Sequence, residues 1–234
     1  MGSDMNDEEV PGSRARRRWL GHCSVLGVAA VLAWPATATA QGPRPAAAPL
    51  ILVVGDSLSA EYGLPRGSGW VALLQARLAQ QKIAADVVNA SISGDTTSGG
   101  RTRLPTLLKQ QRPAIVVLEL GANDALRGLP LAMTYDNLDA MTQAAQAAGA
   151  KVVMVGMQLP PNYGRTYGEE FAALFARLAK ARGTALVPFL LKGVADVPQA
   201  ETLFQRDGIH PIAAAHPTIL ANVWPVLQPL LSKR

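Results

Sequence analysis

The side chains best suited to chemistry lie near opposite ends of the chain. Ser57 follows an apolar run at residues 50–54 and lies in a Gly-Asp-Ser-Leu turn, where the end of a buried strand would expose its hydroxyl. Asp207 and His210 are three residues apart near the carboxyl end. An imidazole can take the proton of a serine hydroxyl, and a carboxylate can fix the imidazole tautomer. These three residues are therefore a candidate triad for hydrolysing esters.

Two further segments offer hydrogen-bond donors for the oxyanion of such a reaction. Gly94 lies in a Ser-Gly-Asp-Thr turn, and a glycine lets a backbone N–H approach a ligand closely. Asn123, in Gly-Ala-Asn-Asp, has a side-chain amide that can donate to the same oxygen. Each also has an ordinary structural explanation: a helix cap for Ser57, a turn glycine for Gly94, and an Asx turn or cap for Asn123. We interpret Asp124 as a cap or a structural hydrogen-bond acceptor.

The candidate base is chosen among three histidines. His22 belongs to an N-terminal segment that we expect to be removed. His216 lies in an Ala-Ala-Ala-His-Pro stretch with no acid beside it. His210 alone has a carboxylate at a spacing that reaches one ring nitrogen. An Asp-Gly turn followed by a surface histidine would give the same pattern.

Other kinds of site lack their sequence signatures. Ser59 stands where the Gly-x-Ser-x-Gly elbow of α/β-hydrolases requires glycine. The turn around Gly94 lacks the Gly-Lys-Ser/Thr ending of a phosphate loop. The few acids in these loops have no ligand-like spacing, and Cys23 is the only cysteine in the sequence. We therefore expect no cofactor, no metal site and no disulfide.

Apolar patterns from residue 50 onward alternate between strand and helix. Short apolar runs bounded by turn residues indicate strands, and apolar residues three or four apart indicate helices. The predicted strands are residues 50–54, 84–90, 115–120, 152–157 and 185–189, and the predicted helices are residues 70–81, 98–110, 135–148, 169–182 and 213–231. Alternation of this kind predicts βαβ units and a five-stranded parallel sheet between helix layers, which is an α/β fold.

Caps and prolines predict where the helices begin and end. Thr134 is a candidate N-cap, and Gly183 is a candidate stop. We expect Pro105 to kink or delay its helix, and we expect Pro217 and Pro225 to break the last one.

The candidate residues share one edge of the predicted sheet. Ligands of such sheets bind beyond the carboxyl ends of the strands. Ser57, Gly94 and Asn123 follow the first three predicted strands, and Asp207 and His210 lie in the loop before the last helix. The sequence therefore predicts that separate loops converge on one site within a single domain.

Composition excludes disorder throughout the chain and argues against nucleic-acid binding. The chain has 234 residues, of which 49% are hydrophobic, enough for one α/β domain with a sizeable core. Its formal net charge is +5, but no run of Lys or Arg occurs after residue 41. A mildly basic surface favours anionic substrates or membrane surfaces only weakly.

The N-terminus has the features of a secretory signal. Arginines at residues 14–18 precede a mostly apolar stretch of 16 residues, shorter than the ~20 of a membrane span. Ala38-Thr39-Ala40 fits the small-x-small rule for cleavage before Gln41. We therefore expect a secreted, periplasmic protein with no stable membrane insertion after cleavage. The expected segments are a signal at residues 1–40, a Pro/Ala linker at residues 41–49 and a catalytic domain at residues 50–232.

Together and in this order, the candidate residues resemble the SGNH hydrolases, also called the GDSL esterase/lipase family. Ser57, Gly94, Asn123 and His210 match its four blocks, and Asp207 fits its Asp-x-x-His. Longer stretches are similar to the secreted bacterial subgroup of thioesterase I, lysophospholipase L1 and arylesterase. These stretches are residues 55–60, 88–96, 103–105, 159–160, 162–164 and 207–211.

The resemblance implies a three-layer α/β/α, flavodoxin-like doubly wound fold and hydrolysis without a cofactor. It implies Ser57 as nucleophile, His210 as base and then acid, and Asp207 as the group that orients the imidazole. The oxyanion would be held by the backbone N–H groups of Ser57 and Gly94 and by the Asn123 side chain. We expect a monomer that acts on a small-molecule ester, whether an aryl or acyl ester, a thioester or a lysophospholipid.

Two positions depart from the pattern of the subgroup. Glu61 stands where glycine is usual, and we expect its carboxylate to narrow the entrance or repel anionic acyl carriers such as coenzyme A. Ala122 replaces a frequent second glycine, which is a milder change. By analogy, the acyl group would lie along apolar segments at residues 124–129 and 157–163. The candidate lining residues, each of which could equally be core, are Leu126, Leu129 and Leu159.

Three other functions fit parts of the pattern. A carbohydrate O-deacetylase would use the same catalytic residues on acetylated sugars. A flavodoxin-like binding module would hold a ligand without chemistry and would leave Ser57 unlabelled by a fluorophosphonate. A flavin or nucleotide protein would absorb beyond the aromatic band, which we do not expect.

Overall fold

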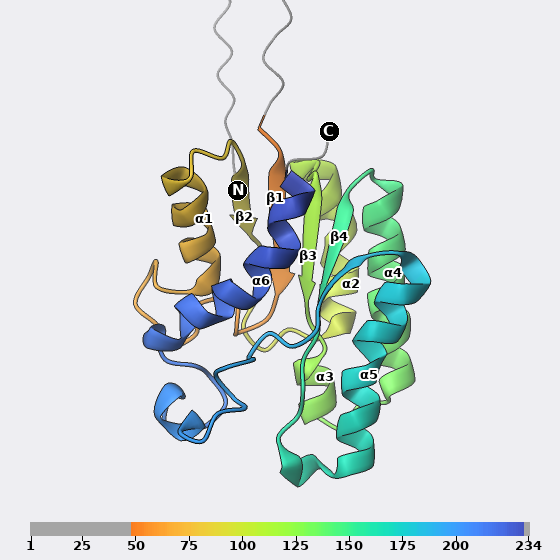
Figure 1. Cartoon of the computed structure of the whole chain (residues 1–234). Helices are drawn as coiled ribbons and strands as arrows, with labels where there is room; N and C mark the ends of the chain where they lie inside the picture. The colour runs from red at the N-terminus through yellow and green to blue at the C-terminus, as the bar shows by residue number, and fades with distance from the viewer. Residues whose placement is uncertain (1–47, 232–234) are drawn as a thin grey trace, which may run out of the picture. The chain divides into compact units, whose positions relative to one another are not determined.

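A five-stranded parallel sheet lies at the centre of the computed structural model, which describes residues 48–231 (Figure 1). The strands are β1 Leu50–Gly55, β2 Asp86–Asn89, β3 Ile115–Glu119, β4 Lys151–Val155 and β5 Ala185–Val187. They are ordered β2-β1-β3-β4-β5, and each neighbouring pair is parallel. The expected flavodoxin-like topology is therefore confirmed. The predicted signal segment and all but the last two residues of the predicted linker lie outside the described residues.

Burial of the strands follows their place in the sheet. β1 and β3 are central, and nearly all of their residues are buried. β2 lies at an edge and is half-buried, and its Asp-Val-Val-Asn sequence is correspondingly polar. β1 pairs with β2 on one side and with β3 on the other, so the direction of winding reverses there. That reversal opens a crevice at the carboxyl ends of β1 and β3, where ligands of such sheets bind.

Helices cover both faces of the sheet (Figure 1). The helices α1 Trp70–Gln80 and α6 His216–Leu231 pack together on one face, whereas α2 Thr97–Gln111, α4 Leu131–Ala147 and α5 Arg165–Arg182 pack side by side on the other. This arrangement gives the expected three layers. Within the described residues, no helix combines the length and the apolar character that a membrane span needs.

Short helical elements lie in the connections that follow β3, β4 and β5. They are α3 Ala122–Leu126, η1 Pro161–Tyr163, η2 Ala200–Leu203 and η3 Ala213–Ala215. The sequence analysis missed α3, because five residues are too few to show a helical period. α3 begins after Gly121, whose φ of +118° suits glycine, and a Cβ there would lie 3.3 Å from Thr134 Cγ2.

The structure confirms the predicted end of α5 and contradicts the predicted start of α4. Gly183 does end α5, in the left-handed conformation with a φ of 62°. Thr134 is not an N-cap, because α4 begins a turn earlier, after Pro130, and Thr134 is buried inside it. Proline is favoured near a helix start because its φ is already close to the helical value.

The prolines interrupt their helices less than expected. α2 begins at Thr97 and continues through Pro105, so that proline does not delay it. α6 runs unbroken through Pro225, which corrects the expected break. Pro217 falls in the first turn of α6, where a missing N–H costs no helical hydrogen bond.

Candidate active site

Ser57, His210 and Asp207 form a hydrogen-bonded row at the carboxyl edge of the sheet. Ser57 Oγ lies 2.9 Å from His210 Nε2, and His210 Nδ1 lies 2.7 Å from Asp207 Oδ2. The serine belongs to the turn after β1, and the other two belong to the loop between η2 and η3, where His210 lies 153 residues after Ser57. With Nδ1–H donating to the carboxylate, Nε2 is left to accept the serine proton. The structure thus brings together the three residues of the candidate triad.

A tight turn sets the ionisation of Asp207. Its Oδ1 accepts hydrogen bonds from the backbone N–H groups of Ile209 at 2.9 Å and His210 at 3.0 Å. Partial burial opposes ionisation, but these two bonds and the imidazole outweigh it and lower the pKa of Asp207 to about 2. The carboxylate therefore stays ionised at neutral pH and can stabilise an imidazolium beside it.

The loop that carries His210 is attached to the loop that follows the nucleophile. The Gln205 side-chain amide donates to the carbonyl oxygens of Tyr62, at 2.9 Å, and Pro211, at 3.1 Å. The Gln205 backbone N–H donates to the His210 carbonyl at 2.7 Å. The Tyr62 ring lies against the imidazole, with 4.4 Å between the ring centroids. The sequence analysis missed Gln205 and Tyr62, because neither belongs to a motif that bears chemistry.

The candidate oxyanion donors come from the ends of the first three strands. Within residues 48–231, the backbone N–H groups of Ser57 and Gly94 have no hydrogen-bond acceptor. Gly94 has a φ of +77°, a conformation that favours glycine. Both amide hydrogens of Asn123 are engaged, since Nδ2 lies 3.0 Å from Asp56 Oδ2 and 3.0 Å from the Asp95 carbonyl oxygen. A substrate oxyanion would therefore share one of these hydrogens.

Two buried carboxyl groups lie beneath the nucleophile turn. Asp56 is 1% exposed, and burial raises its pKa to about 6, although the Leu58 N–H and the Asn123 amide donate to it. Burial also raises the pKa of Glu119 well above its usual value, and the Asp56 charge adds to the effect. Glu119 Oε2 accepts from Ser59 Oγ at 2.7 Å. The one sequence signal for this pair was an acid ending the otherwise apolar strand β3.

Glu61 serves a different purpose from the one expected. Its φ is +59°, a conformation that favours glycine, the residue that the resemblance implies at this position. Its Oε1 accepts hydrogen bonds from the backbone N–H groups of Gly67 at 3.0 Å and Gly69 at 2.8 Å. The carboxylate is therefore directed at the loop before α1 and does not line the cavity beside Ser57. The expectation that Glu61 narrows the entrance is wrong.

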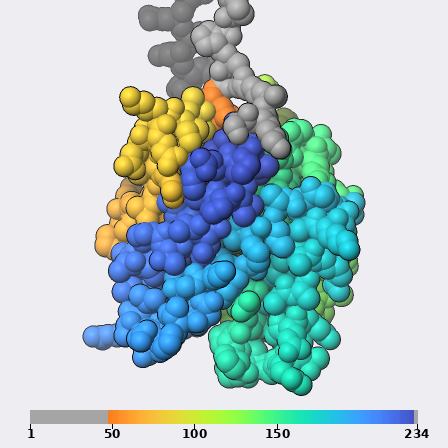
Figure 2. All heavy atoms as spheres, viewed as in Figure 1, coloured from red at the N-terminus to blue at the C-terminus, as the bar shows by residue number. Residues whose placement is uncertain are grey.

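A largely apolar cavity of about 900 Å³ begins at Ser57 and His210. One wall is the segment around η1, and the other is the segment from β5 to His210; Figure 2 shows both at the surface, in teal and light blue. Leu126 and Leu159 line it as expected, but Leu129 does not. The apolar lining residues are Leu58, Ala122, Leu126, Met157, Leu159, Pro160, Pro161, Phe189, Leu191, Ala195, Ala200, Phe204 and Ile209.

Asp124 has a structural role, as the sequence suggested, and so does His216, which the sequence only set aside as the base. His216 is buried, and its Nδ1 accepts from the Trp70 backbone N–H at 3.0 Å, at the start of α1. Burial lowers the pKa of His216, which favours the neutral acceptor. Asp124 is buried and accepts from the backbone N–H of Thr97 at 2.8 Å, which ties α3 to α2.

No metal site is evident in the part of the chain that the structure describes: no three His, Cys, Asp or Glu side chains there are grouped to hold an ion. The groups that the structure brings together at this edge are a hydroxyl, an imidazole and a carboxylate beside backbone N–H donors.

Known proteins match most of the chain. A model of the GDSL-like lipase/acylhydrolase family matches residues 53–217. Esterase TesA from Pseudomonas aeruginosa is 55% identical over 186 residues, which are 80% of this chain and 91% of that protein. Thioesterase 1/protease 1/lysophospholipase L1 from Escherichia coli K12 is 44% identical over 189 residues, 81% of this chain and 88% of that protein. An arylesterase from Vibrio mimicus is 43% identical over 169 residues, 72% of this chain and 83% of that protein.

A solved structure shares the fold as well as the sequence. The crystal structure of TesA superimposes with a TM-score of 0.74 at 55% sequence identity, covering 77% of this chain and 99% of that chain. The similarity extends over nearly the whole of the related molecule.

Proposed function

Because the chain belongs to the GDSL-like lipase/acylhydrolase family, we propose that Ser57, His210 and Asp207 are the triad with which it hydrolyses esters. Relatives at 44–55% identity identify the chain as a carboxylic ester hydrolase of the esterase and thioesterase/lysophospholipase type. The observation that carries the triad is the 2.9 Å distance between Ser57 Oγ and His210 Nε2, together with the 2.7 Å distance between His210 Nδ1 and Asp207 Oδ2.

Acylation begins when His210 Nε2 takes the Ser57 proton while Oγ attacks the acyl carbonyl carbon. The carbonyl π electrons move to oxygen, and that oxyanion accepts hydrogen bonds from the Ser57 and Gly94 backbone N–H groups and from Asn123. Asp207 stabilises the imidazolium through Nδ1–H. As the carbonyl re-forms, the bond to the leaving alcohol or thiol breaks, and His210 Nε2–H protonates that group.

Deacylation repeats the sequence with water as nucleophile. His210 takes a proton from water, the new hydroxyl attacks the acyl-enzyme, and the Ser57 oxygen leaves with the proton from Nε2. The products are a carboxylic acid and the free enzyme. In each half of the reaction, His210 takes one proton and gives one back, so the imidazole ends in the state in which it began.

The acyl chain of the substrate lies in the apolar cavity, between the segment around η1 and the segment from β5 to His210. Aryl esters, acyl thioesters and lysophospholipids are the substrate classes that this shape supports, in keeping with the names of the relatives. Burial of each additional methylene stabilises the complex by about 0.8 kcal/mol, so the cavity favours acyl chains longer than acetyl.

Ser57→Ala tests the proposal. Hydrolysis of p-nitrophenyl butyrate should fall by about 10⁴-fold or more, because no other group can form the acyl-enzyme. Ser68→Ala is the matched control, since Ser68 Oγ bonds only to the Pro65 carbonyl in an exposed turn. Turnover by Ser57→Ala close to that of the parent would refute the assignment.

A substrate profile separates the remaining alternatives. We expect activity across p-nitrophenyl esters from acetate to decanoate, with lysophospholipid and acyl-CoA measured beside them. Activity confined to acetylated sugars would indicate an O-deacetylase. Failure of a fluorophosphonate to label Ser57 would indicate a binding module without chemistry.

We also propose that residues 1–40 are a signal removed on export to the periplasm, with the linker at residues 41–49 and the catalytic domain at residues 50–232. The arginine-rich start, the apolar stretch and Ala38-Thr39-Ala40 support this division. N-terminal sequencing of the exported protein should give Gln41 as the first residue. Light scattering should give the mass of a monomer.

A further inference from the structure

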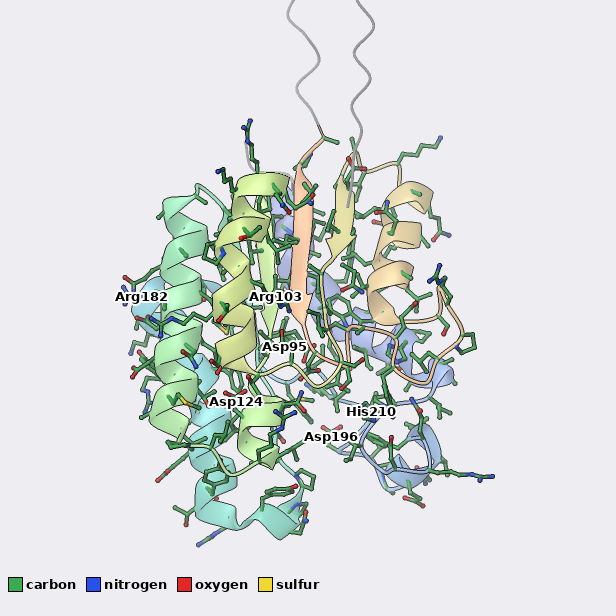
Figure 3. All side chains as sticks on the ribbon, turned by 180° about the vertical axis from the view of Figure 1, so that it is seen from behind. Asp95, Arg103, Asp124, Arg182, Asp196 and His210 are labelled. Atoms are coloured by element: carbon green, nitrogen blue, oxygen red, sulfur yellow. The ribbon has the colours of Figure 1, made fainter. Side chains whose placement is uncertain are left out.

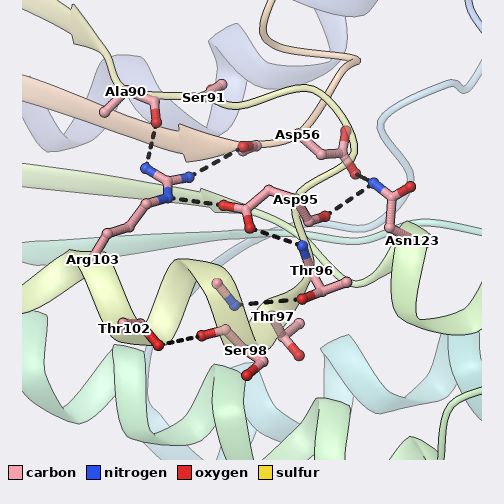
Figure 4. Close-up of polar contacts among 12 residues, drawn as sticks. Asp56, Ala90, Ser91, Asp95, Thr96, Thr97, Ser98, Thr102, Arg103 and Asn123 are labelled. Atoms are coloured by element: carbon pink, nitrogen blue, oxygen red, sulfur yellow. Dashed lines mark hydrogen bonds and ion pairs between the residues drawn. The ribbon is translucent and has the colours of Figure 1, made fainter.

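Arg103 has no part in the chemistry described above, although it begins the Arg-Leu-Pro stretch through which the sequence resembles the family. Its side chain extends from α2 toward the sheet and is 19% exposed (Figure 4). Nε lies 2.8 Å from Asp95 Oδ2, Nη1 donates to the Ala90 carbonyl, and Nη2 lies 3.4 Å from the Gly55 carbonyl. One guanidinium therefore joins the carboxyl end of β1, the residue after β2 and the loop that follows.

These contacts flank the backbone donors of the candidate oxyanion site. The Gly55 carbonyl precedes Ser57 by two residues, and the Ala90 carbonyl precedes the loop that contains Gly94. Asp95 directly follows Gly94. Because the Ser57 and Gly94 N–H groups have no acceptor among the residues that the structure describes, their direction depends on how these neighbouring segments are held.

The third donor is reached through Asp95. Its Oδ1 accepts from the Thr96 backbone N–H at 3.0 Å, so both carboxylate oxygens are bound. The Asp95 carbonyl oxygen accepts from Asn123 Nδ2 at 3.0 Å. This bond helps to direct the NH₂ group of Asn123, rather than its oxygen, at the nucleophile turn. The ion pair between Arg103 and Asp95 thus contacts segments that carry all three donors (Figure 4).

We propose that Arg103 and Asp95 are positioning residues that hold the three oxyanion donors in a common direction, an inference that rests on the proposed function. The planar guanidinium bonds two carbonyls and a carboxylate at once, which a lysine ammonium on a flexible chain cannot reproduce with the same geometry. Misplaced donors weaken the transition state more than the bound substrate, so the defect should appear in kcat.

The chain contains a matched control pair. Arg182 and Asp139 form a two-pronged ion pair between α5 and α4, and Figure 3 shows Arg182 on the outer helix layer, away from His210. Arg182→Met removes an ion pair of the same chemistry without touching any segment of the site.

The test compares Arg103→Met, Arg103→Lys and Arg182→Met by kcat, KM and thermal unfolding, with p-nitrophenyl butyrate as substrate. Arg103→Met should lower kcat on the order of 10²-fold, as removal of one oxyanion donor does, with KM within about threefold of the parent value. Arg103→Lys should restore part of kcat, and Arg182→Met should leave kcat unchanged. The pH dependence of kcat/KM should keep its midpoint in all three, because the imidazole is not altered.

A kcat for Arg103→Lys and Arg103→Met equal to that of Arg182→Met would overturn the positioning role. If Arg103→Met does not fold, Arg103→Lys and Asp95→Asn decide the matter: a loss of kcat without a rise in KM supports the role, and parental kcat refutes it. Failure of the underlying function is distinct, because it would appear as an active Ser57→Ala enzyme.

Discussion

The two sides of Ser57 are built in different ways. On the side of the proposed oxyanion donors, buried polar groups hold the backbone: Asp56 is 1% exposed and accepts from Asn123, and the buried Glu119 accepts from Asp56 N–H and Ser59 Oγ in the nucleophile turn. On the histidine side, the Asp207 side chain is 35% exposed and belongs to a long loop between short helices.

This difference separates two tasks within one site. Where negative charge develops, donors need a fixed direction, and strand ends braced by buried hydrogen bonds supply it. Where substrates enter, the loop that carries His210 is also a wall of the apolar cavity, and it is attached mainly through Gln205 and Tyr62. Substitutions on the two sides should therefore differ in the size of the loss of kcat and in the pH range over which stability changes.

The largest effect is expected on the histidine side. Asp207→Asn should lower kcat by about 10³–10⁴-fold, because the amide no longer fixes the tautomer or stabilises the imidazolium. The variant should remain folded by circular dichroism, since the carboxylate is partly exposed. Asp136→Asn, on the exposed face of α4, is the control and should have parental kinetics. Unchanged turnover by Asp207→Asn would exclude this residue from the triad.

A change in the cavity wall should alter specificity and leave the chemical step intact. Leu159→Ala should lower kcat/KM for p-nitrophenyl decanoate by about 10-fold relative to acetate, because the long acyl chain loses apolar contact. Leu129→Ala, at a leucine outside the lining, is the matched control. An equal loss for both esters would show that the acyl chain lies elsewhere.

The buried side should be visible in the pH dependence of stability. The folded state holds the Asp56 proton up to a pKa of about 6, against an ordinary value of 3.8, so between these values it binds more protons than the unfolded state. The Asp56 contribution therefore lowers the free energy of unfolding as pH rises through this window, by up to about 1.4 kcal/mol per pH unit for one proton. Urea unfolding of Asp56→Asn should lack this part of the slope.

Asp207 should show the opposite sign. Its pKa is lowered from 3.8 to about 2, so its stabilising contribution is present above pH 3.8 and is lost as pH falls toward 2. In Asp207→Asn, the free energy of unfolding should therefore keep its slope between pH 4 and 6, and its pH dependence should change only below about pH 4. A variant at Asp56 that retained the upper slope would contradict the comparison of the two sides.

The smallest effect concerns the loop after the nucleophile. Glu61→Ala keeps the positive φ but loses the bonds to Gly67 and Gly69, whereas Glu61→Gly loses the bonds and removes the strain. The glycine variant should be more stable than the alanine variant by about 1 kcal/mol in urea unfolding. Hydrolysis of acyl-CoA should be the same in both variants and in the parent. Faster hydrolysis of acyl-CoA by both variants would contradict this prediction and would show that the Glu61 carboxylate repels the anionic substrate.

Much of the fold followed from the sequence, because buried parallel strands and amphipathic helices leave periodic patterns. The alternation predicted the sheet, and the sheet predicted that Ser57, Gly94 and Asn123 lie at one edge. α3 escaped detection because it is shorter than two helical turns. Pro105 does not delay α2 and Pro225 does not break α6, because tertiary packing outweighs local propensity there.

The polar support of the site could not be read from sequence. Asp56 contacts Asn123 across 67 residues, and Ser59 contacts Glu119 across 60, and no local pattern encodes such pairs. The direction of the Glu61 carboxylate likewise depends on a loop six residues away. The motifs identified the candidate reacting groups and Asp207, whereas the contacts of Asp56, Glu119 and Gln205 are evident only in the folded chain.

The most direct test of the triad and its oxyanion site is a crystal structure of the protein after reaction with a phosphonate ester. The account predicts phosphorus bonded to Ser57 Oγ, with a phosphonyl oxygen within hydrogen-bond distance of the Ser57 and Gly94 backbone nitrogens and Asn123 Nδ2. Phosphorus on another side chain, or a phosphonyl oxygen directed away from all three nitrogens, would contradict it.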